Sequence, residues 1–415
     1  MTGPSPFAYG PWRAFFAARL SATLAFLMLS VVLAWQVYDL ARASRPVEEA
    51  AFLLGLIGLV QFLPVVLLVT LAGTLADRRD RGLVARAALG LQALCALALG
   101  ALAEAGTAAL WPWFVLAFLL GVGRAFAMPA MTALAPNLVP PPVLPAAIAW
   151  SSIAWQAGAV AGPVAGGLLY DRGPALPHWA AALLLALALG ALLRIPAMPP
   201  PGAERRGLAA VREGLRYVRS NPVVLGAISL DLAAVVLAGA TALLPVYARD
   251  ILGAGPQALG WLRAAPAIGA AAVAFLLARR PLRRRVGRAM FAGVALFALM
   301  TVVFALSTDI RLSLFALAVM GGADMVSVYV RASLIQLHTP DAMRGRVSAV
   351  STLCISASNE LGEFRAGLAA ALLGPVAATA LGGAFALGVT LLWARLFPAL
   401  READRLEVPP ALRQS

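Results

Sequence analysis

The chain has 415 residues, of which 61% are hydrophobic and 13% are charged, and its mean hydropathy is +0.86. Soluble domains carry about 25% charged residues, so this composition excludes a soluble enzyme and leaves no room for a folded domain outside a membrane. The formal net charge of +14 comes from arginine alone, because the chain has no lysine. We assign this charge to orientation in the bilayer and not to nucleic-acid binding.

Twelve apolar stretches follow one another, and each is long enough to cross a hydrocarbon core of about 30 Å as a helix. The sequence therefore predicts an all-α membrane protein whose twelve transmembrane helices form two six-helix pseudo-symmetric bundles. The predicted spans are 14–38, 50–72, 83–103, 110–134, 143–169, 178–195, 223–247, 257–278, 286–306, 312–336, 347–372 and 376–397.

The longest link between spans, rich in proline and arginine, divides the chain into six spans plus six. It predicts an N-terminal bundle over 1–195, a cytoplasmic linker over 196–222, and a C-terminal bundle with a short cytoplasmic tail over 223–415.

Arginine positions predict the orientation. With the N-terminus in the cytoplasm, the cytoplasmic side holds 24 of the 33 arginines, the opposite side holds five, and four lie inside spans. Positive residues gather on the cytoplasmic side of membrane proteins, so we expect a multi-pass protein of a bacterial inner membrane with both termini cytoplasmic.

The two halves carry a faint internal repeat. When residues 121–170 are placed on 321–370 without a gap, Gly121, Gly162 and Gly167 each meet a glycine 200 positions later. This pattern fits two related bundles repeated about an axis along the membrane normal, which is a known transporter arrangement.

The loop after the second span reads Gly73-Thr74-Leu75-Ala76-Asp77-Arg78-Arg79-Asp80-Arg81. It resembles the signature loop of the major facilitator superfamily, except that Asp80 stands where a glycine is usual and that Gly82 and Leu83 replace the usual basic pair. The resemblance implies a conformational latch in which the aspartate meets a neighbouring helix end, a contact of roughly 0.3–1 kcal/mol. The alternative is a solvated loop that only sets topology. The implied latch residues are Gly73, Asp77, Arg78 and Arg81.

The fifth span carries a run of small residues in which Gly158, Gly162 and Gly166 are four apart and share one helix face. Pro163 removes a backbone donor and predicts a bend. Together with Gly167 the run resembles the superfamily's antiporter motif, which implies export. The alternative is the small-residue stripe of any packed membrane helix.

Four acidic residues lie inside apolar stretches: Asp231, Asp324, Glu360 and Glu363. An ionisable group at membrane depth is costly and marks a path for protons, ions or substrate. We hypothesise that these acids, with the neighbouring Asn359, supply proton and substrate sites. The energy source would be a proton gradient, because a nucleotide-binding loop needs a lysine.

Three arginines inside spans, Arg124, Arg263 and Arg331, are predicted to tune these acids or to bind an anionic group. Two alternatives stay open. Arg124 can instead extend to the membrane interface, and Arg331 can form a structural ion pair with Asp324, seven residues earlier on the same helix.

Several phrases resemble the drug-exporter branch of the superfamily that includes enterobactin exporter-like proteins. They are Trp35-Gln36-Val37-Tyr38-Asp39-Leu40, Gln61-Phe62-Leu63-Pro64, Arg344-Gly345-Arg346-Val347-Ser348-Ala349-Val350 and Ala357-Ser358-Asn359-Glu360-Leu361-Gly362-Glu363-Phe364. The resemblance covers the whole chain. Five residues are predicted to line a cavity, although tryptophan near a span end is more often an interface anchor: Trp35, Gln36, Gln61, Trp155 and Gln156.

We therefore predict a monomeric secondary transporter, not an enzyme, that exports an amphiphilic drug or siderophore in exchange for protons by alternating access. No cofactor or metal is expected, because the two cysteines and two histidines lie far apart in sequence. Three alternatives remain: uptake of a siderophore or other small molecule, lysophospholipid transport in the same fold, and a non-transporting membrane sensor.

Overall fold

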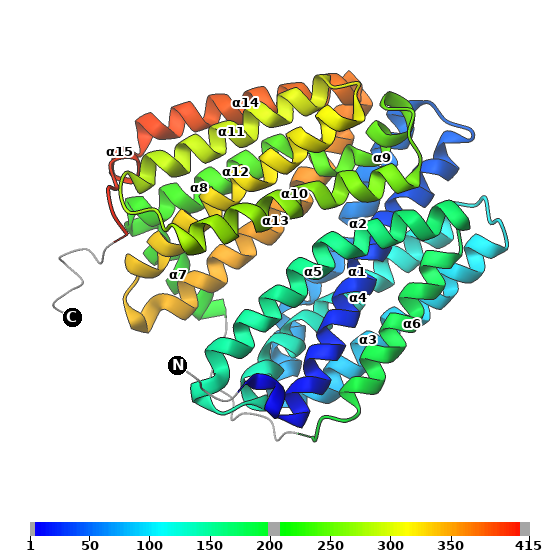
Figure 1. The fold of residues 1–415 in the computed structure, drawn as a ribbon, viewed down its shortest axis with the longest axis horizontal. Coiled ribbons are helices and arrows are strands. Elements are labelled where there is room, and N and C mark those ends of the chain that lie inside the picture. Colours follow the sequence, from blue (N-terminus) through cyan, green and yellow to red (C-terminus); the bar gives the residue numbers. More distant parts are fainter. Residues whose placement is uncertain (1–4, 198–207, 407–415) are drawn as a thin grey trace. The chain divides into compact units, whose positions relative to one another are not determined.

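The computed structural model describes residues 5–197 and 208–406, and within these ranges every regular element is a helix. The helices are α1 (Gly10–Arg42), α2 (Val47–Arg78), α3 (Arg81–Glu104), α4 (Trp111–Leu134), α5 (Leu144–Arg172), α6 (Leu176–Leu192), α7 (Leu208–Ser220), α8 (Pro222–Ala238), α9 (Leu244–Val246), α10 (Pro256–Arg279), α11 (Val286–Leu306), α12 (Ile310–Leu337), α13 (Asp341–Leu373), α14 (Pro375–Leu396) and α15 (Pro398–Arg401) (Figure 1). Short 3₁₀ turns η1 (Pro6–Ala8), η2 (Ala135–Leu138), η3 (Pro141–Val143) and η4 (Ala240–Leu243) and a π-helical turn η5 (Tyr247–Ile251) join them.

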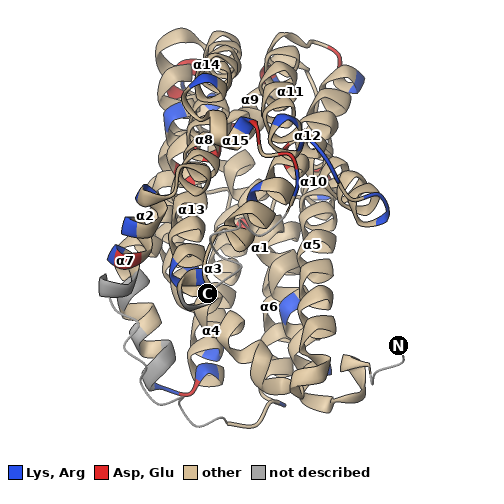
Figure 2. Cartoon of the chain, turned by 90° about the vertical axis from the view of Figure 1, so that its left-hand side faces the viewer, with Lys and Arg blue, Asp and Glu red and all other residues tan. Residues whose placement is uncertain are grey.

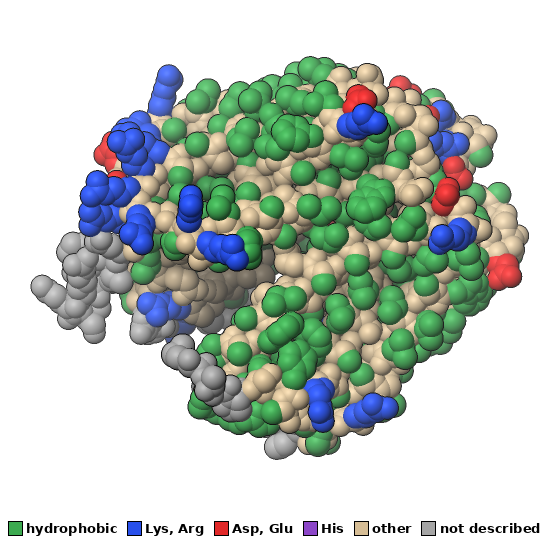
Figure 3. Space-filling view, in the orientation of Figure 1, with side chains coloured by type: hydrophobic (Ala, Val, Ile, Leu, Met, Phe, Trp, Pro, Cys, Tyr) green, Lys and Arg blue, Asp and Glu red, His purple; other side chains and the backbone are tan. Residues whose placement is uncertain are grey.

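Ten helical segments of the described chain are long and apolar enough to cross a membrane. The other two predicted spans are α6, which has 17 residues, and α13, which has 33 residues but carries more charge. Charged residues lie mainly near helix ends (Figure 2), and the visible surface of the helices is largely hydrophobic (Figure 3). Leu183, Phe275 and Phe385 are each more than half exposed. Apolar surface of this kind is suited to lipid, and the predicted twelve-helix membrane fold is confirmed.

The chain packs as two compact units. As far as the chain is described, unit 1 takes its residues from 1–46, 56–204 and 248–264, and unit 2 takes them from 47–55, 205–247 and 265–415. The start of α2 therefore packs with unit 2, and the start of α10 packs with unit 1. The domain boundaries expected at 195 and 222 stay predictions.

The same packing scheme recurs inside each unit (Figure 1). In unit 1, α1 packs against α5 and α6, while α3 packs against α4 and α6. In unit 2, α8 packs against α13 and α14, while α11 packs against α12 and α14. Helices α1, α3, α4, α5 and α6 of unit 1 thus correspond in chain order to α8, α11, α12, α13 and α14 of unit 2. Two pseudo-symmetric bundles require this correspondence.

Glycines of the internal repeat lie at equivalent helix crossings. A Cβ atom on Gly121 of α4 would lie 2.2 Å from the carbonyl oxygen of Gln61 in α2, and one on Gly321 of α12 would lie 2.0 Å from that of Pro266 in α10. No side chain fits at such a distance, so both crossings require glycine.

The second pair of repeat glycines, Gly162 and Gly362, also lies at close helix crossings. A Cβ atom on Gly162 of α5 would lie 3.1 Å from the Leu24 oxygen in α1, and one on Gly362 of α13 would lie 2.8 Å from the Val235 oxygen in α8. The faint sequence repeat thus corresponds to close backbone contacts between equivalent helices.

The seventh predicted span, 223–247, is not one continuous helix. Helix α8 ends at Ala238, and the chain then passes through Gly239, η4, α9 and η5. Pro245 lies in this segment and has no backbone N–H to donate. The break places Arg249 and Asp250 on a π-helical turn, an element that is frequent at functional sites.

Helix α7 lies in the stretch that the sequence predicted to be a linker. It packs on α13, with Gly214 facing the Arg346 carbonyl oxygen and Glu213 paired with the Arg346 side chain at 2.9 Å. Val218 joins a buried cluster with α8, α12 and α13 residues. The second part of the predicted linker is therefore an ordered part of unit 2.

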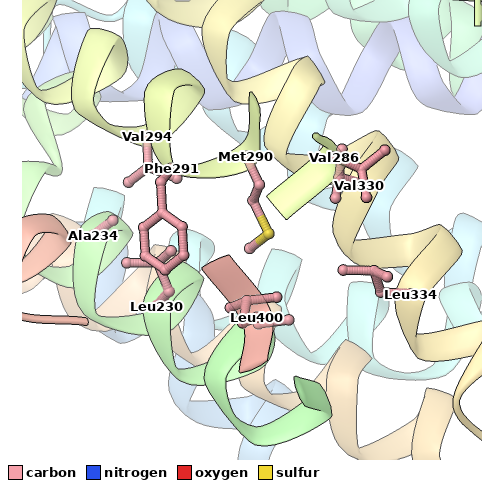
Figure 4. Close-up of a cluster of buried hydrophobic side chains, with 10 residues drawn as sticks. Leu230, Ala234, Val286, Met290, Phe291, Val294, Val330, Leu334 and Leu400 are labelled. Atoms are coloured by element: carbon pink, nitrogen blue, oxygen red, sulfur yellow. The ribbon is translucent and has the colours of Figure 1, made fainter. Parts of the chain in front are cut away.

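Buried hydrophobic side chains from α8, α11, α12 and α15 form one cluster in unit 2 (Figure 4). Met290 and Phe291 of α11 and Leu400 of α15 belong to it. So do Leu230 and Val330, which directly precede Asp231 and Arg331 in sequence. Asp231 and Arg331 are themselves buried, on two of the helices that build this cluster.

Candidate functional site

Asp231 of α8 and Arg331 of α12 form an ion pair in unit 2, and their side chains are 8% and 6% exposed. The sequence left open a pair between Arg331 and Asp324. The structure instead gives Arg331 a partner on another helix. A buried pair holds helices in register at a desolvation cost, and it leaves neither charge alone in apolar surroundings.

Asp324 of α12 is half-buried, and among the described residues its side chain has no hydrogen-bond or ion-pair partner. A carboxylate in apolar surroundings without a cation is costly, and a bound proton removes that cost. Of the four predicted acids, Asp324 is therefore the one whose surroundings best suit reversible protonation.

The remaining predicted polar residues of unit 2 lie on α13. Glu360 and Glu363 are half-buried and Asn359 is exposed. The same helix contacts α8 closely at Gly362. The Arg365 guanidinium lies next to Gly382 of α14, where a Cβ atom would be 3.3 Å from Nη2.

Two of the three predicted arginines belong to unit 1. Arg263 lies near the start of α10, where Gly260 faces the Pro163 carbonyl oxygen of α5. Arg124 lies on α4, with its Cζ atom 4.8 Å from the centre of the Phe26 ring. The third, Arg331, lies in unit 2 and contacts one of the four acids, Asp231.

A cavity in unit 1 lies between α1, α3, α4 and α5 and contains about 650 Å³ of empty space, part of it open to solvent. Arg124 and Trp155, both predicted, line it, together with Arg19 and Gln92, which the sequence reasoning did not select. Arg19 was counted with the topology-setting arginines because it lies near the start of a span. Its position nine residues into α1, among apolar neighbours, was the available signal.

The other predicted cavity residues have different surroundings. Gln61 lines a smaller space that also borders Arg124. Trp35 and Gln36 are buried, and Gln36 Oε1 accepts a hydrogen bond of 2.8 Å from the Tyr170 hydroxyl. Gln156 is half-buried on α5. Trp35 and Gln36 thus pack α1 against α5 and line neither of these two spaces.

The glycine run of α5 packs on α1. A Cβ atom on Gly158 would lie 2.6 Å from Thr23 Cγ2, and one on Gly166 would lie 3.1 Å from Val32 Cγ2. Thr23 also lines the cavity of unit 1. The small-residue stripe therefore sets the α1–α5 distance at the cavity wall.

The signature loop is in part helical. Gly73 lies in α2 with open space around it, and Asp77 and Arg78 form its last turn, with side chains outside the described part of the structure. Arg81 donates a hydrogen bond of 2.8 Å to the Ala133 oxygen. Asp80, one of the departures from the family pattern, caps α3 by accepting a 2.9 Å hydrogen bond from the Gly82 N–H.

A polar cluster that the sequence reasoning missed joins the end of α1 to η5 within unit 1. Arg249 pairs with Asp39, while Asp250 accepts hydrogen bonds from Tyr38 and, at 2.9 Å, from Arg42. These residues are more than 200 positions apart in sequence, so no local pattern indicated the contact.

Comparisons with known proteins agree with this architecture. The family model described as "Major Facilitator Superfamily" matches residues 12–363. The enterobactin exporter EntS of Citrobacter koseri is 28% identical over 408 residues, covering 96% of this chain and 94% of that protein. EntS of Escherichia coli (strain SMS-3-5 / SECEC) is 28% identical over 424 residues, covering 97% and 95%.

Solved structures show the same fold at low identity. The POT family transporter PepTSo has a TM-score of 0.72 and 14% identity, covering 95% of this chain and 99% of that chain. A bacterial homologue of the human lysosomal transporter Spinster has a TM-score of 0.68 and 15% identity, covering 97% of each chain.

Proposed function

This chain belongs to the Major Facilitator Superfamily and is a transporter, and we propose that it exports an amphiphilic small molecule in exchange for protons. It would do so by alternating access, as transporters built from paired repeats do. We place it in a bacterial inner membrane with both termini cytoplasmic, working as a monomer with the proton gradient as its energy source and without a cofactor.

The observation that carries the coupling proposal is the contrast between two aspartates of unit 2. Asp231 has Arg331 as its counter-ion, whereas Asp324 has no partner among the described residues. A fixed cation such as Arg331 favours the charged form of its carboxylate, whereas a half-buried carboxylate without one favours a bound proton. We assign Asp324 as the main proton site, with Glu360 and Glu363 as further candidates.

The direction and the kind of substrate rest on two supports. The glycine run of α5 has the antiporter pattern, and relatives named enterobactin exporters match nearly the whole chain. Both favour export of a siderophore or a drug-like molecule. The signature loop would act as a latch through Asp77 during the cycle.

Transport into inverted membrane vesicles tests the proposal. Labelled enterobactin and the dye ethidium serve as probes, and the vesicle interior is made acidic. We expect accumulation of at least one probe that a protonophore abolishes and that Asp324→Asn prevents. Accumulation that ignores the protonophore would contradict proton coupling, and gradient-driven loss of probe from the vesicles would indicate uptake into cells.

The latch has its own test. Asp77→Asn is expected to slow turnover while the affinity for the transported probe stays the same. Turnover equal to that of the wild-type protein would remove the latch assignment and leave the coupling proposal untouched.

A further inference from the structure

The loop between α10 and α11 concentrates positive charge at one end of unit 2 (Figure 3). Six of the ten residues from 279 to 288 are arginines, and all six are exposed: Arg279, Arg280, Arg283, Arg284, Arg285 and Arg288. Within residues 5–197 and 208–406, none of these six side chains has a hydrogen-bond or ion-pair partner. Like charges held in one short loop repel one another, so a negatively charged partner would stabilise it.

The counterpart of this loop in unit 1 is the signature loop between α2 and α3, because α2 crosses α4 as α10 crosses α12. The signature loop carries its own acid, Asp80, which caps α3 and pairs with Arg86. The loop from 279 to 288 has no acidic residue, and the carboxylate that accepts the Arg285 backbone N–H, at 3.1 Å, is that of Asp404. Orientation in the membrane does not require the loss of acids, since acidic residues contribute little to it.

The fold holds this loop in place. Leu282, in its middle, packs against the buried cluster of unit 2. The backbone N–H groups of Val286 and Gly287 donate to the carbonyl oxygens of Asp404 and Ala403, at 3.3 and 2.9 Å. The arginines on both sides of Leu282 therefore stay at the surface. A ligand would meet a backbone that is already ordered, which lowers the entropy cost of binding.

The basic loop directly continues an apolar surface of α10. Phe275 and Leu276, near the end of this membrane-spanning helix, are 59% and 55% exposed. The Cζ atom of Arg279 lies 4.1 Å from the centre of the Phe275 ring. Positive charge thus begins where the surface suited to acyl chains ends. Lipid headgroups lie at this same boundary between hydrocarbon and water, which favours a lipid over a soluble polyanion as the partner.

We propose that the loop from 279 to 288 is a binding surface for acidic phospholipids. Its arginines bind the phosphate groups, for which the guanidinium fork is suited, and the acyl chains lie along Phe275 and Leu276. Clusters of about four to eight basic residues next to a membrane helix attract acidic lipids in this way. The loop joins two membrane helices, so it lies at a membrane surface in either orientation. In the orientation proposed above, that surface is the cytoplasmic one.

The test compares two lipids that share their acyl chains and differ in headgroup charge. Dioleoylphosphatidylglycerol is acidic and dioleoylphosphatidylcholine has no net charge. Each is titrated into the full-length protein in a nonionic detergent, and bound lipid is counted by native mass spectrometry. We expect the acidic lipid to bind about tenfold or more tightly, the size expected from one or two arginines near a headgroup. Equal affinities in the wild-type protein would overturn the proposal, and that comparison needs no variant.

Two triple variants locate the site. The first removes three arginines of the loop and should lower phosphatidylglycerol affinity about tenfold or more, with phosphatidylcholine affinity unchanged: Arg280→Gln, Arg283→Gln and Arg284→Gln. The matched control removes the same charge from exposed arginines of α7, which packs on α13 and α8, and should bind both lipids like the wild type: Arg212→Gln, Arg216→Gln and Arg219→Gln. Equal losses in the two variants would mean that the lipid responds to overall charge, and would overturn the assignment to this loop.

A soluble phosphate separates a lipid surface from a general phosphate site. Glycerol 3-phosphate, added at the concentration of the lipid, should leave phosphatidylglycerol bound, because it lacks the acyl chains that lie along α10. Displacement would show that the loop takes free phosphate groups and would overturn the lipid assignment. These measurements involve no transport, so their failure leaves the proposed function intact, and a failure of proton-driven transport leaves this inference intact.

Discussion

Arg331 and Asp231 meet across α12 and α8 as a buried ion pair, and Asp324, two turns before Arg331 on α12, has no such partner in the described part of the chain. The two aspartates lie in similar apolar helices but differ in their counter-ions. Neutralising Asp231 would leave the buried Arg331 cation without its described counter-ion, whereas neutralising Asp324 would leave no described cation unpaired.

Asp231→Asn is expected to destabilise the protein strongly. Loss of one partner of a buried pair leaves the Arg331 charge in apolar surroundings, at a cost of about 3 kcal/mol or more. The measurement is the thermal unfolding midpoint of the purified protein. The double variant Asp231→Leu with Arg331→Met should recover most of the loss, and a single variant as stable as the wild type would show that the pair is not formed.

Asp324→Asn is expected to keep or raise the unfolding midpoint and to abolish proton-driven transport. Its neutralisation removes an unpartnered carboxylate and orphans no cation. Midpoint and vesicle transport are measured on the same preparation. A large fall in stability would mean that Asp324 has a structural partner, and unchanged proton dependence would transfer the proton site to α13.

Gly321→Ala is expected to lower the unfolding midpoint. The new Cβ atom would lie 2.0 Å from the Pro266 carbonyl oxygen, so α10 and α12 must separate, and overpacking of this kind costs about 1–3 kcal/mol or more. Gly90→Ala in α3 is the control, because a Cβ atom there meets nothing within 4 Å. The control should gain stability by roughly 0.5–1 kcal/mol, since alanine is the better helix former. Equal midpoints for the two variants would contradict the close crossing.

Two substitutions of Asp80 separate its roles. Asp80→Ala removes both the cap of α3 and the pair with Arg86, and should cost about 1 kcal/mol. Asp80→Asn keeps an oxygen for the Gly82 N–H and should stay near the wild type, because a partly exposed ion pair contributes little. The unfolding midpoint ranks the three proteins. If Asp80→Asn were as unstable as Asp80→Ala, the ion pair and not the cap would be the stabilising contact.

Much of the fold could be predicted because membrane-spanning helices are recognisable in a sequence as long stretches of high hydropathy. The ends of α11 agree with the prediction of 286–306 to the residue. Helix α7 was not predicted because it has only 13 residues, too few to span a membrane, and because its arginines made the segment look like a charged linker. Val211, Leu215 and Val218, four and three apart, carried the helical signal.

The site could be predicted only in part, because spacing along one helix says which residues share a face and not what lies opposite. Asp324 and Arg331 share a face of α12, yet the partner of Arg331 comes from α8, more than ninety residues earlier. The sequence indicates that Arg19 lies inside an apolar helix. Only the fold shows that α3, α4 and α5 enclose a cavity beside it.

Helix crossings made by backbone atoms, such as those at Gly121 and Gly321, have no rotamers through which strain can relax. Dense packing of this kind is hard to compress and passes displacement on. A shift of α4 is therefore expected to carry α2 with it, and a shift of α12 to carry α10, because no side chain at either crossing can yield.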